Sequence, residues 1–112
     1  MEEASENAYD VEKSSLVQEW LENLEKLCKD DYANVYNRLR LIERLGHFGD
    51  RKSVGGNVSE LRLHCGPGYR VYYTRIGKKI VFLLCAGSKS GQERDIRLAH
   101  KLAKEVRNER KG

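Results

Sequence analysis

Residues 58–86 of the 112-residue chain read VSELRLHCGPGYRVYYTRIGKKIVFLLCA. Hydrophobic and polar residues alternate on both sides of Gly66-Pro67-Gly68, and an unbroken apolar run, Ile80–Ala86, follows a second turn at Gly77. Alternation with a period of two is typical of strands with one buried face, and a continuous apolar run is typical of a strand buried on both faces. The stretch therefore predicts three strands joined as an antiparallel meander.

Helical patterns flank the meander. Before it, residues 8–13 predict a short strand, Ser14 and Ser15 offer N-caps for a helix, and a second helix runs from Asp30 or Asp31 to about Leu45. The expected core stripe of the first helix is Leu16, Trp20, Leu24 and Leu27, and that of the second is Val35, Leu39 and Ile42. After the meander, residues 92–107 predict a last helix with a core stripe of Ile96, Ala99, Leu102, Ala103 and Val106. The predicted order is βααβββα, a single α+β domain over residues 1–112 with helices packed on an antiparallel sheet.

Three segments are expected outside regular structure. Residues 46–57 are rich in glycine and charge and predict a mobile loop that leads into the sheet. Residues 1–7 are expected to form a disordered extension, and residues 108–112 a frayed tail.

Composition narrows the class of protein. The chain has no apolar run of about 18 residues, so no membrane span is expected. Its acidic start lacks the basic and apolar regions of a secretory signal, which favours the cytoplasm. Three cysteines without a CxxC pair indicate reduced, buried thiols, and we expect neither a metal site nor a cofactor.

Charge is divided unevenly along the chain. Residues 1–31 hold ten acidic against three basic residues, a net −7, and residues 32–112 hold seven against eighteen, a net +11. The C-terminal part is therefore suited to a polyanion, although basic surfaces also occur in proteins that bind no nucleic acid.

The candidate site follows from strand alternation. Arg62 and His64 are expected on the polar face of one strand, and Arg70 and Tyr72 on the polar face of its hairpin partner, with Lys89 just beyond the third strand. Two arginines and a lysine, with no obvious acids to neutralise them, suit a phosphate and the extra charge of a pentacoordinate transition state. Taken singly, each arginine is also explained as a solvated ion pair, for example Arg62 with an acidic neighbour. His64 is the one histidine placed where a proton can usefully move, and simple solvent exposure explains it equally well.

These segments resemble a known family. ELR at residues 60–62, GPGYRVYY at 66–73, LLCAGSKSGQ at 83–92 and DI at 95–96 resemble the RelE/ParE superfamily, in particular its HigB-like group of addiction module killer or phage-derived Gp49-like proteins, and the likeness spans about residues 8–107. It implies a microbial-RNase-like fold and metal-independent cleavage of messenger RNA, often on the ribosome. By matching position it implies that Arg62, Arg70 and Lys89 are catalytic. Lys52, His64 and Tyr72 are the expected RNA-binding residues.

The sequence also departs from the family pattern. The segment around the lysine is Gly87-Ser88-Lys89-Ser90-Gly91-Gln92, which lacks the acidic neighbour of the lysine. No clear counterpart of the Tyr or His that several relatives place near the last helix is present, so the group that moves the proton stays open between His64 and Tyr72.

The resemblance also implies partners. A type II toxin of this kind is held inactive by a cognate antitoxin, typically a helix-turn-helix protein like HigA, and contacts operator DNA only through it. Two alternatives remain open: a poison of DNA gyrase, as ParE-like members are, and an inactive toxin-like module that acts only in an antitoxin and operator complex. Retention of Arg62, Arg70 and Lys89 favours the nuclease over the gyrase poison.

Overall fold

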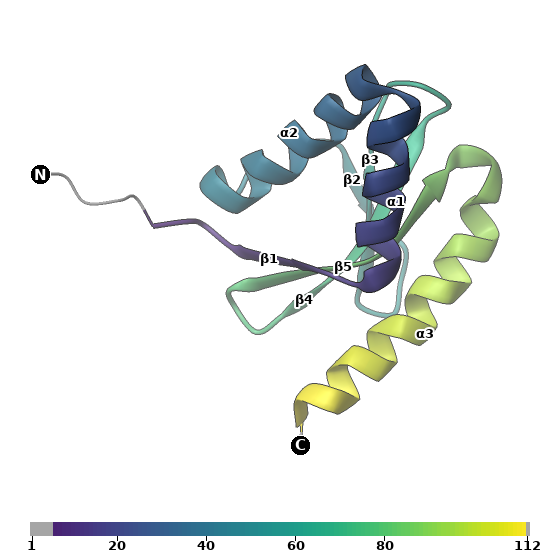
Figure 1. The fold of residues 1–112 in the computed structure, drawn as a ribbon. Helices are drawn as coiled ribbons and strands as arrows, with labels where there is room; N and C mark the ends of the chain where they lie inside the picture. The colour runs from purple at the N-terminus through teal and green to yellow at the C-terminus, as the bar shows by residue number, and fades with distance from the viewer. Residues whose placement is uncertain (1–5, 112) are drawn as a thin grey trace, which may run out of the picture.

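The computed structural model describes residues 6–111, with side chains to residue 110. In chain order the elements are β1 (Asp10–Lys13), α1 (Ser15–Leu27), α2 (Lys29–Leu45), β2 (Arg51–Ser53), β3 (Val58–Arg62), β4 (Tyr69–Ile76), β5 (Ile80–Ser88), the short 3-10 turn η1 (Lys89–Gly91) and α3 (Gln92–Lys111) (Figure 1). None of the helices in residues 6–111 is both long and apolar enough to cross a membrane.

The predicted α+β class is confirmed, and the strands form one five-stranded sheet in the order β1-β5-β4-β3-β2. The meander of β3, β4 and β5 is antiparallel as predicted. The expectation of a wholly antiparallel sheet is wrong, because β1 runs parallel to β5. Parallel neighbours require a long connection, and here both helices and strands β2–β4 lie between β1 and β5 in the chain.

The segment predicted as a loop contains β2. Arg51–Ser53 pair antiparallel with Ser59–Leu61, and a turn with positive φ at Gly55, Gly56 and Asn57 joins the strands. His100 on α3 holds this turn, since its Nε2 lies 2.9 Å from the Val54 carbonyl oxygen. The prediction of a plain loop was wrong because all three strand residues are polar and exposed, which leaves no alternation to detect.

The N-cap of α1 and the end of α2 match the sequence prediction, but α2 begins earlier than expected, at Lys29 after Cys28 instead of behind Asp30 or Asp31. The Ser14 hydroxyl caps α1 by accepting the Val17 N–H, and Gly46 ends α2 in the left-handed conformation. The predicted stripe of α2 is buried as expected. On α1 the predicted stripe is partly wrong. Leu24 is buried and Trp20 packs against the core as expected, but Leu16 and Leu27 are exposed and Val17 and Leu21 face the core instead.

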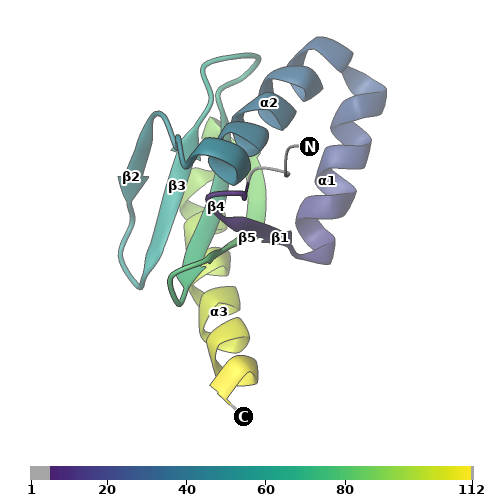
Figure 2. The ribbon, with the colours of Figure 1, turned by 90° about the vertical axis from the view of Figure 1, so that its left-hand side faces the viewer.

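Helices cover both faces of the sheet. Figures 1 and 2 show α1 and α2 together on one side, with α3 apart from them. The α1/α2 side contains the larger core, which includes Leu61, Val71 and Leu83. On the α3 side Ala99 and Ala103 pack against a smaller core with Val58, Tyr72 and Leu84. Two alanines let the helix axis approach the sheet closely, and the face predicted to be polar and open to solvent is therefore largely covered.

Helix and side-chain contacts continue toward both ends of the described chain. The last helix continues through Lys111, and the Arg107 guanidinium fastens it to β4 by donating to the Thr74 hydroxyl at 2.8 Å and the Arg75 carbonyl at 2.7 Å. At the other end the Asn7 carbonyl accepts a hydrogen bond from Lys79. Residues 1–5 of the predicted extension and Gly112 of the predicted tail lie outside the described residues.

Ser14 joins α1 to the sheet, which gives a test of the fold. Its hydroxyl accepts from Val17 N–H at 3.2 Å and donates to the Leu84 carbonyl at 2.8 Å. We expect Ser14→Ala to lower the free energy of unfolding by about 1–2 kcal/mol, measured by chemical denaturation. The exposed neighbour Ser15 is the matched control, and an equal loss in Ser15→Ala would contradict the capping role.

Candidate active site

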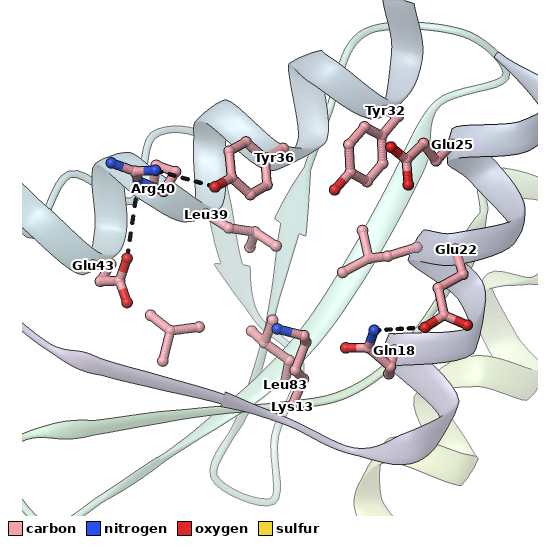
Figure 3. A pocket seen from close by; sticks show the side chains of 12 residues that line it. Lys13, Gln18, Glu22, Glu25, Tyr32, Tyr36, Leu39, Arg40, Glu43 and Leu83 are labelled. Atoms are coloured by element: carbon pink, nitrogen blue, oxygen red, sulfur yellow. Dashed lines mark hydrogen bonds and ion pairs between the residues drawn. The ribbon is translucent and has the colours of Figure 1, made fainter. Parts of the chain in front are cut away.

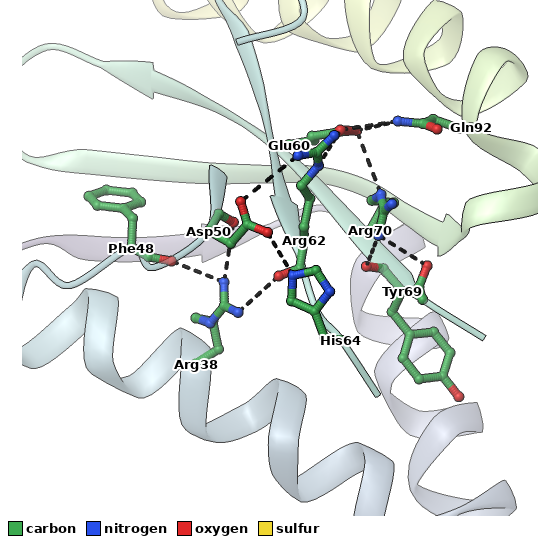
Figure 4. Close-up of polar contacts among 10 residues, drawn as sticks. Arg38, Phe48, Asp50, Glu60, Arg62, His64, Tyr69, Arg70 and Gln92 are labelled. Atoms are coloured by element: carbon green, nitrogen blue, oxygen red, sulfur yellow. Dashed lines mark hydrogen bonds and ion pairs between the residues drawn. The ribbon is translucent and has the colours of Figure 1, made fainter. Parts of the chain in front are cut away.

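Arg62 and Arg70 lie directly opposite each other on β3 and β4. Residues opposite each other in an antiparallel pair project to the same face, which here is the face that α3 covers. The convergence of the two arginines predicted from strand alternation is therefore present, at the end of the sheet where β3 stops (Figure 4).

A buried carboxylate lies between the two guanidinium groups. Glu60 is 0% exposed, and its Oε1 lies 3.3 Å from Arg62 Nε while its Oε2 lies 3.9 Å from Arg70 Nε. Gln92, the first residue of α3, donates from Nε2 to both oxygens at 3.0 and 2.8 Å. The expectation of arginines without a neutralising acid is wrong. The sequence placed Glu60 on the correct face, but its burial depends on α3.

The two arginines differ in their access to solvent. The Arg62 side chain is 33% exposed, whereas that of Arg70 is 9% exposed and is close to the backbone oxygens of Gly68 and Tyr69. Because Glu60 approaches the Nε side of both groups, the terminal nitrogens of Arg62 remain available to an anion at the surface.

Lys89 stands beside Arg70 at the same end of the sheet. A Cβ atom placed on Gly68 would lie 3.6 Å from Lys89 Cβ and 3.7 Å from Arg70 Nη1, so both residues border this turn. Lys89 is exposed and also lines an open hollow of about 560 Å³ together with Arg94 and Arg97 of α3. Arg94 and Arg97 were not among the predicted site residues, because the last helix was analysed only for its core stripe.

His64 extends the site beyond the end of β3. Its Nε2 donates to Asp50 Oδ2 at 2.7 Å, and Asp50 Oδ1 lies 4.0 Å from Arg62 Nη1. The hydrogen bond from His64, with smaller contributions from Arg62 and Arg38, lowers the pKa of the Asp50 carboxyl. Asp50 was not among the predicted site residues, because it precedes His64 by 14 positions and lies in a segment without a motif.

Arg38 on α2 fixes the segment that carries Asp50. Its Nη1 donates to the Phe48 carbonyl at 3.0 Å, and its Nη2 donates to the Arg62 carbonyl at 2.9 Å. Gly49, with φ of +73°, packs against this guanidinium so closely that an added Cβ would lie 3.1 Å from Arg38 Cζ. One side chain therefore joins α2, the Asp50 segment and the end of β3.

The other two predicted RNA-binding residues, Lys52 and Tyr72, lie in different surroundings, one exposed and one buried. Lys52 is exposed on β2 and pairs in register with Glu60, so it shares the face of the arginines at the edge of the sheet. Tyr72 is fully buried beneath α3, and no group in the described part of the chain hydrogen-bonds to its hydroxyl. Burial, followed by the charge of Glu60, raises the pKa of this hydroxyl. The expectation that Tyr72 contacts RNA is wrong, because α3 covers the central part of that face.

The chain is similar to known proteins both in sequence and in fold. The sequence pattern of the Phage derived protein Gp49-like family matches residues 19–105. The chain belongs to this Gp49-like family. It is 41% identical over 87 residues to an uncharacterized protein of Haemophilus influenzae, covering 78% of this chain and 85% of that protein. A double mutant of the E. coli toxin RelE in the free state has the same fold, with a TM-score of 0.61 and 20% sequence identity over 88% of this chain and 98% of RelE. The predicted Gp49-like relationship and RelE-like fold are thus confirmed.

A second cavity in this Gp49-like protein lies on the other face of the sheet. It has a volume of about 460 Å³ and opens between α1, α2 and β1 (Figure 3). Polar side chains that line it form hydrogen bonds with each other: Gln18 donates to Glu22 at 2.8 Å, and Arg40 donates to the Tyr36 hydroxyl at 3.1 Å. None of the predicted site residues lines it.

Neither the acidic side chains nor the thiols of residues 6–110 form a metal site. No group of three or more His, Cys, Asp or Glu side chains in that range is placed to hold a metal ion. The three cysteines are free, with Cys85 buried and Cys28 and Cys65 half-buried. Burial raises the pKa of the Cys85 thiol to about 12, which leaves it without nucleophilic thiolate at neutral pH.

Glu60 offers a test of the buried network of the Gp49-like site. Its removal leaves Arg70 without its charge partner in a covered position, so we expect Glu60→Ala to lower the free energy of unfolding by about 3–5 kcal/mol. Chemical denaturation measures the effect, and the exposed Glu93→Ala is the control. A loss no larger than that of the control would show that the ion pairs do not hold the site together.

Tyr72 offers the opposite test, because its buried hydroxyl has no hydrogen-bond partner among the described residues. We expect Tyr72→Phe to raise the free energy of unfolding by about 1 kcal/mol, since the unsatisfied polar group is removed. Tyr73→Phe is the matched control: the Tyr73 hydroxyl accepts from Arg51 at 3.5 Å, and no gain is expected there. A loss of stability in Tyr72→Phe would contradict the buried, unpaired placement of the hydroxyl.

Proposed function

We propose that this Gp49-like protein is the toxin of a type II toxin–antitoxin pair and acts as a metal-independent endoribonuclease that cleaves mRNA. The observation that carries the proposal is the Arg62–Arg70 pair, fixed by Glu60 and joined by Lys89 at an open end of the sheet. The likeness in fold to a protein described as the toxin RelE supports it.

Charge stabilisation is the main chemistry that this arrangement offers. In the proposed reaction the ribose 2′-oxygen attacks the adjacent phosphorus and the 5′-oxygen leaves, which gives a 2′,3′-cyclic phosphate and a 5′-hydroxyl. The pentacoordinate transition state carries more charge on its non-bridging oxygens than the ground state does. Arg62, Arg70 and Lys89 stabilise that charge, and their positions are set before the substrate binds.

Basic side chains around the arginine pair extend this surface, so that it can follow an RNA backbone. Lys52 lies on one side of the arginine pair and Arg94 and Arg97 on the other, next to Lys89. Contacts of this kind suit RNA that is bound to the ribosome, because the phosphates of mRNA and ribosomal RNA lie close together there. They also make RNA binding dependent on salt concentration. The proposed site of action is therefore the cytoplasm.

An antitoxin completes the proposed system. We expect it to be a helix-turn-helix protein like HigA that neutralises the toxin and carries it to operator DNA. Covering the exposed Arg62 or filling the hollow beside Lys89 would prevent RNA from entering the site.

Substitution of the arginine pair tests the activity. We expect Arg62→Ala and Arg70→Ala each to reduce RNA cleavage about 100-fold or more, since removal of one preorganised donor typically costs that much. Arg44→Ala, exposed on α2, is the charge-matched control. The measurement is mapping of mRNA ends after induction in bacteria, together with cleavage in vitro with and without a chelator.

Three outcomes would contradict the proposal. Cleavage that a chelator abolishes would exclude a metal-independent mechanism. Growth arrest with intact mRNA and damaged DNA would indicate a gyrase poison. An absence of toxicity would indicate a module that acts only in an antitoxin complex. Because Arg70 is nearly buried, Arg62→Ala is the decisive variant if Arg70→Ala does not fold.

A further inference from the structure

The site described above stabilises charge but still requires a group that takes the proton from the attacking hydroxyl. Tyr72 does not meet this need, because it is fully buried and its pKa is raised by burial. His64 follows Arg62 by two residues, and its side chain is 73% exposed. It is therefore accessible to a substrate that Arg62 binds.

Asp50 sets the protonation pattern of the His64 ring. A carboxylate is only an acceptor, so the imidazole Nε2 carries the hydrogen in the 2.7 Å contact with Asp50 Oδ2. In the neutral ring the proton-free nitrogen is then Nδ1, which is the atom that can accept a proton. An imidazole oriented by a carboxylate in this way is a general base with a defined tautomer.

Arg38 on α2 fixes the position of the segment that carries Asp50. Arg38 binds the carbonyls of Phe48 and Arg62, the first of which lies two residues before Asp50, and its Nη1 also lies 3.5 Å from the Asp50 carbonyl. The carboxylate consequently faces Arg62 on one side and His64 on the other, as Figure 4 shows. A surface ion pair without a second support would lack this restraint.

We propose that His64 is the general base of this site and that Asp50 is its positioning residue. The inference rests on the proposed RNA cleavage and adds the residue that moves the proton. His64 Nδ1 takes the proton of the ribose 2′-hydroxyl while the 2′-oxygen forms its bond to phosphorus and the bond from phosphorus to the 5′-oxygen breaks. The 5′-oxygen takes a proton from water, and the imidazolium returns its proton to solvent.

The proposed role makes the reaction dependent on pH. Asp50 contacts the ring, and Arg62 on β3 and Arg38 on α2 are the cations around that carboxylate. The base must be neutral before it accepts a proton, so we expect kcat/KM to rise with pH along an acid limb that disappears when His64 is removed.

Two variants test the pair on an RNA substrate of fixed sequence. We expect His64→Ala to lower kcat about 100-fold or more and to lose the acid limb, and we expect added imidazole to restore part of the rate because the vacated position is open to solvent. We expect Asp50→Asn to lower kcat at least 10-fold, because the ring loses the contact that orients it. His47→Ala, an exposed histidine in the loop after α2, is the matched control and should retain the profile of the unsubstituted protein.

A measurement without activity separates positioning from general loss of structure. Nitrogen-15 NMR of the whole protein should show neutral His64 with its hydrogen on Nε2, and Asp50→Asn should reduce the population of that tautomer while the other amide signals stay in place. A His64→Ala variant that keeps both the rate and the acid limb would overturn the proposal, as would a tautomer that Asp50→Asn leaves unchanged.

Failure of this inference can be distinguished from failure of the proposed function. If the unsubstituted protein cleaves RNA and Arg62→Ala does not, but His64→Ala behaves as the unsubstituted protein does, only the assignment of the base is wrong. If the unsubstituted protein leaves RNA intact under every condition, the proposed function itself fails.

Discussion

The architecture of the site depends on the burial of the Glu60 carboxylate beneath α3. A buried carboxylate is costly unless all of its acceptor positions are used, and here two guanidinium groups and the Gln92 amide supply the partners. Since these partners come from β3, β4 and the first residue of α3, the carboxylate connects three elements at one point. The arginines therefore keep their positions when no anion is bound, which is the condition for electrostatic preorganisation.

The position of α3 explains which part of the sheet face is structural and which part is accessible. Over Tyr72 and Val58 the helix packs through Ala99 and Ala103, and all four residues are buried. Toward the end of β3 the helix has reached its first residue, and Arg62 and His64 emerge beyond it. The basic residues at this end of the sheet thus form a boundary zone between the core and the surface. The atoms of these side chains nearest the backbone are held in place by the core, while their outer atoms can contact a ligand.

The sequence was sufficient for the parts of this arrangement that local geometry determines. Alternation around the Gly66-Pro67-Gly68 turn fixes the register of β3 and β4, so the opposition of Arg62 and Arg70 could be predicted. It was insufficient where two distant segments meet. The burial of Glu60 and Tyr72 depends on which face of the sheet α3 packs against. The parallel pairing of β1 depends on the path of the whole chain, and the three polar residues of β2 carry no periodic signal.

The Asp50–His64 contact is the clearest case of information that only the fold supplies. Neither residue belongs to a recognisable motif, and they meet because Arg38 on α2 draws the Phe48–Asp50 segment against the end of β3. The same carboxylate faces Arg62 at 4.0 Å, so the groups that hold charge and the group proposed to move a proton share one counter-ion. In the proposed reaction, a phosphate that binds Arg62 competes with Asp50 for that guanidinium. The same carboxylate also contacts the proposed base, so the reaction as proposed couples substrate binding to the placement of His64 through one side chain. This shared contact is geometric: it depends on Arg38 holding the Asp50 segment against the end of β3.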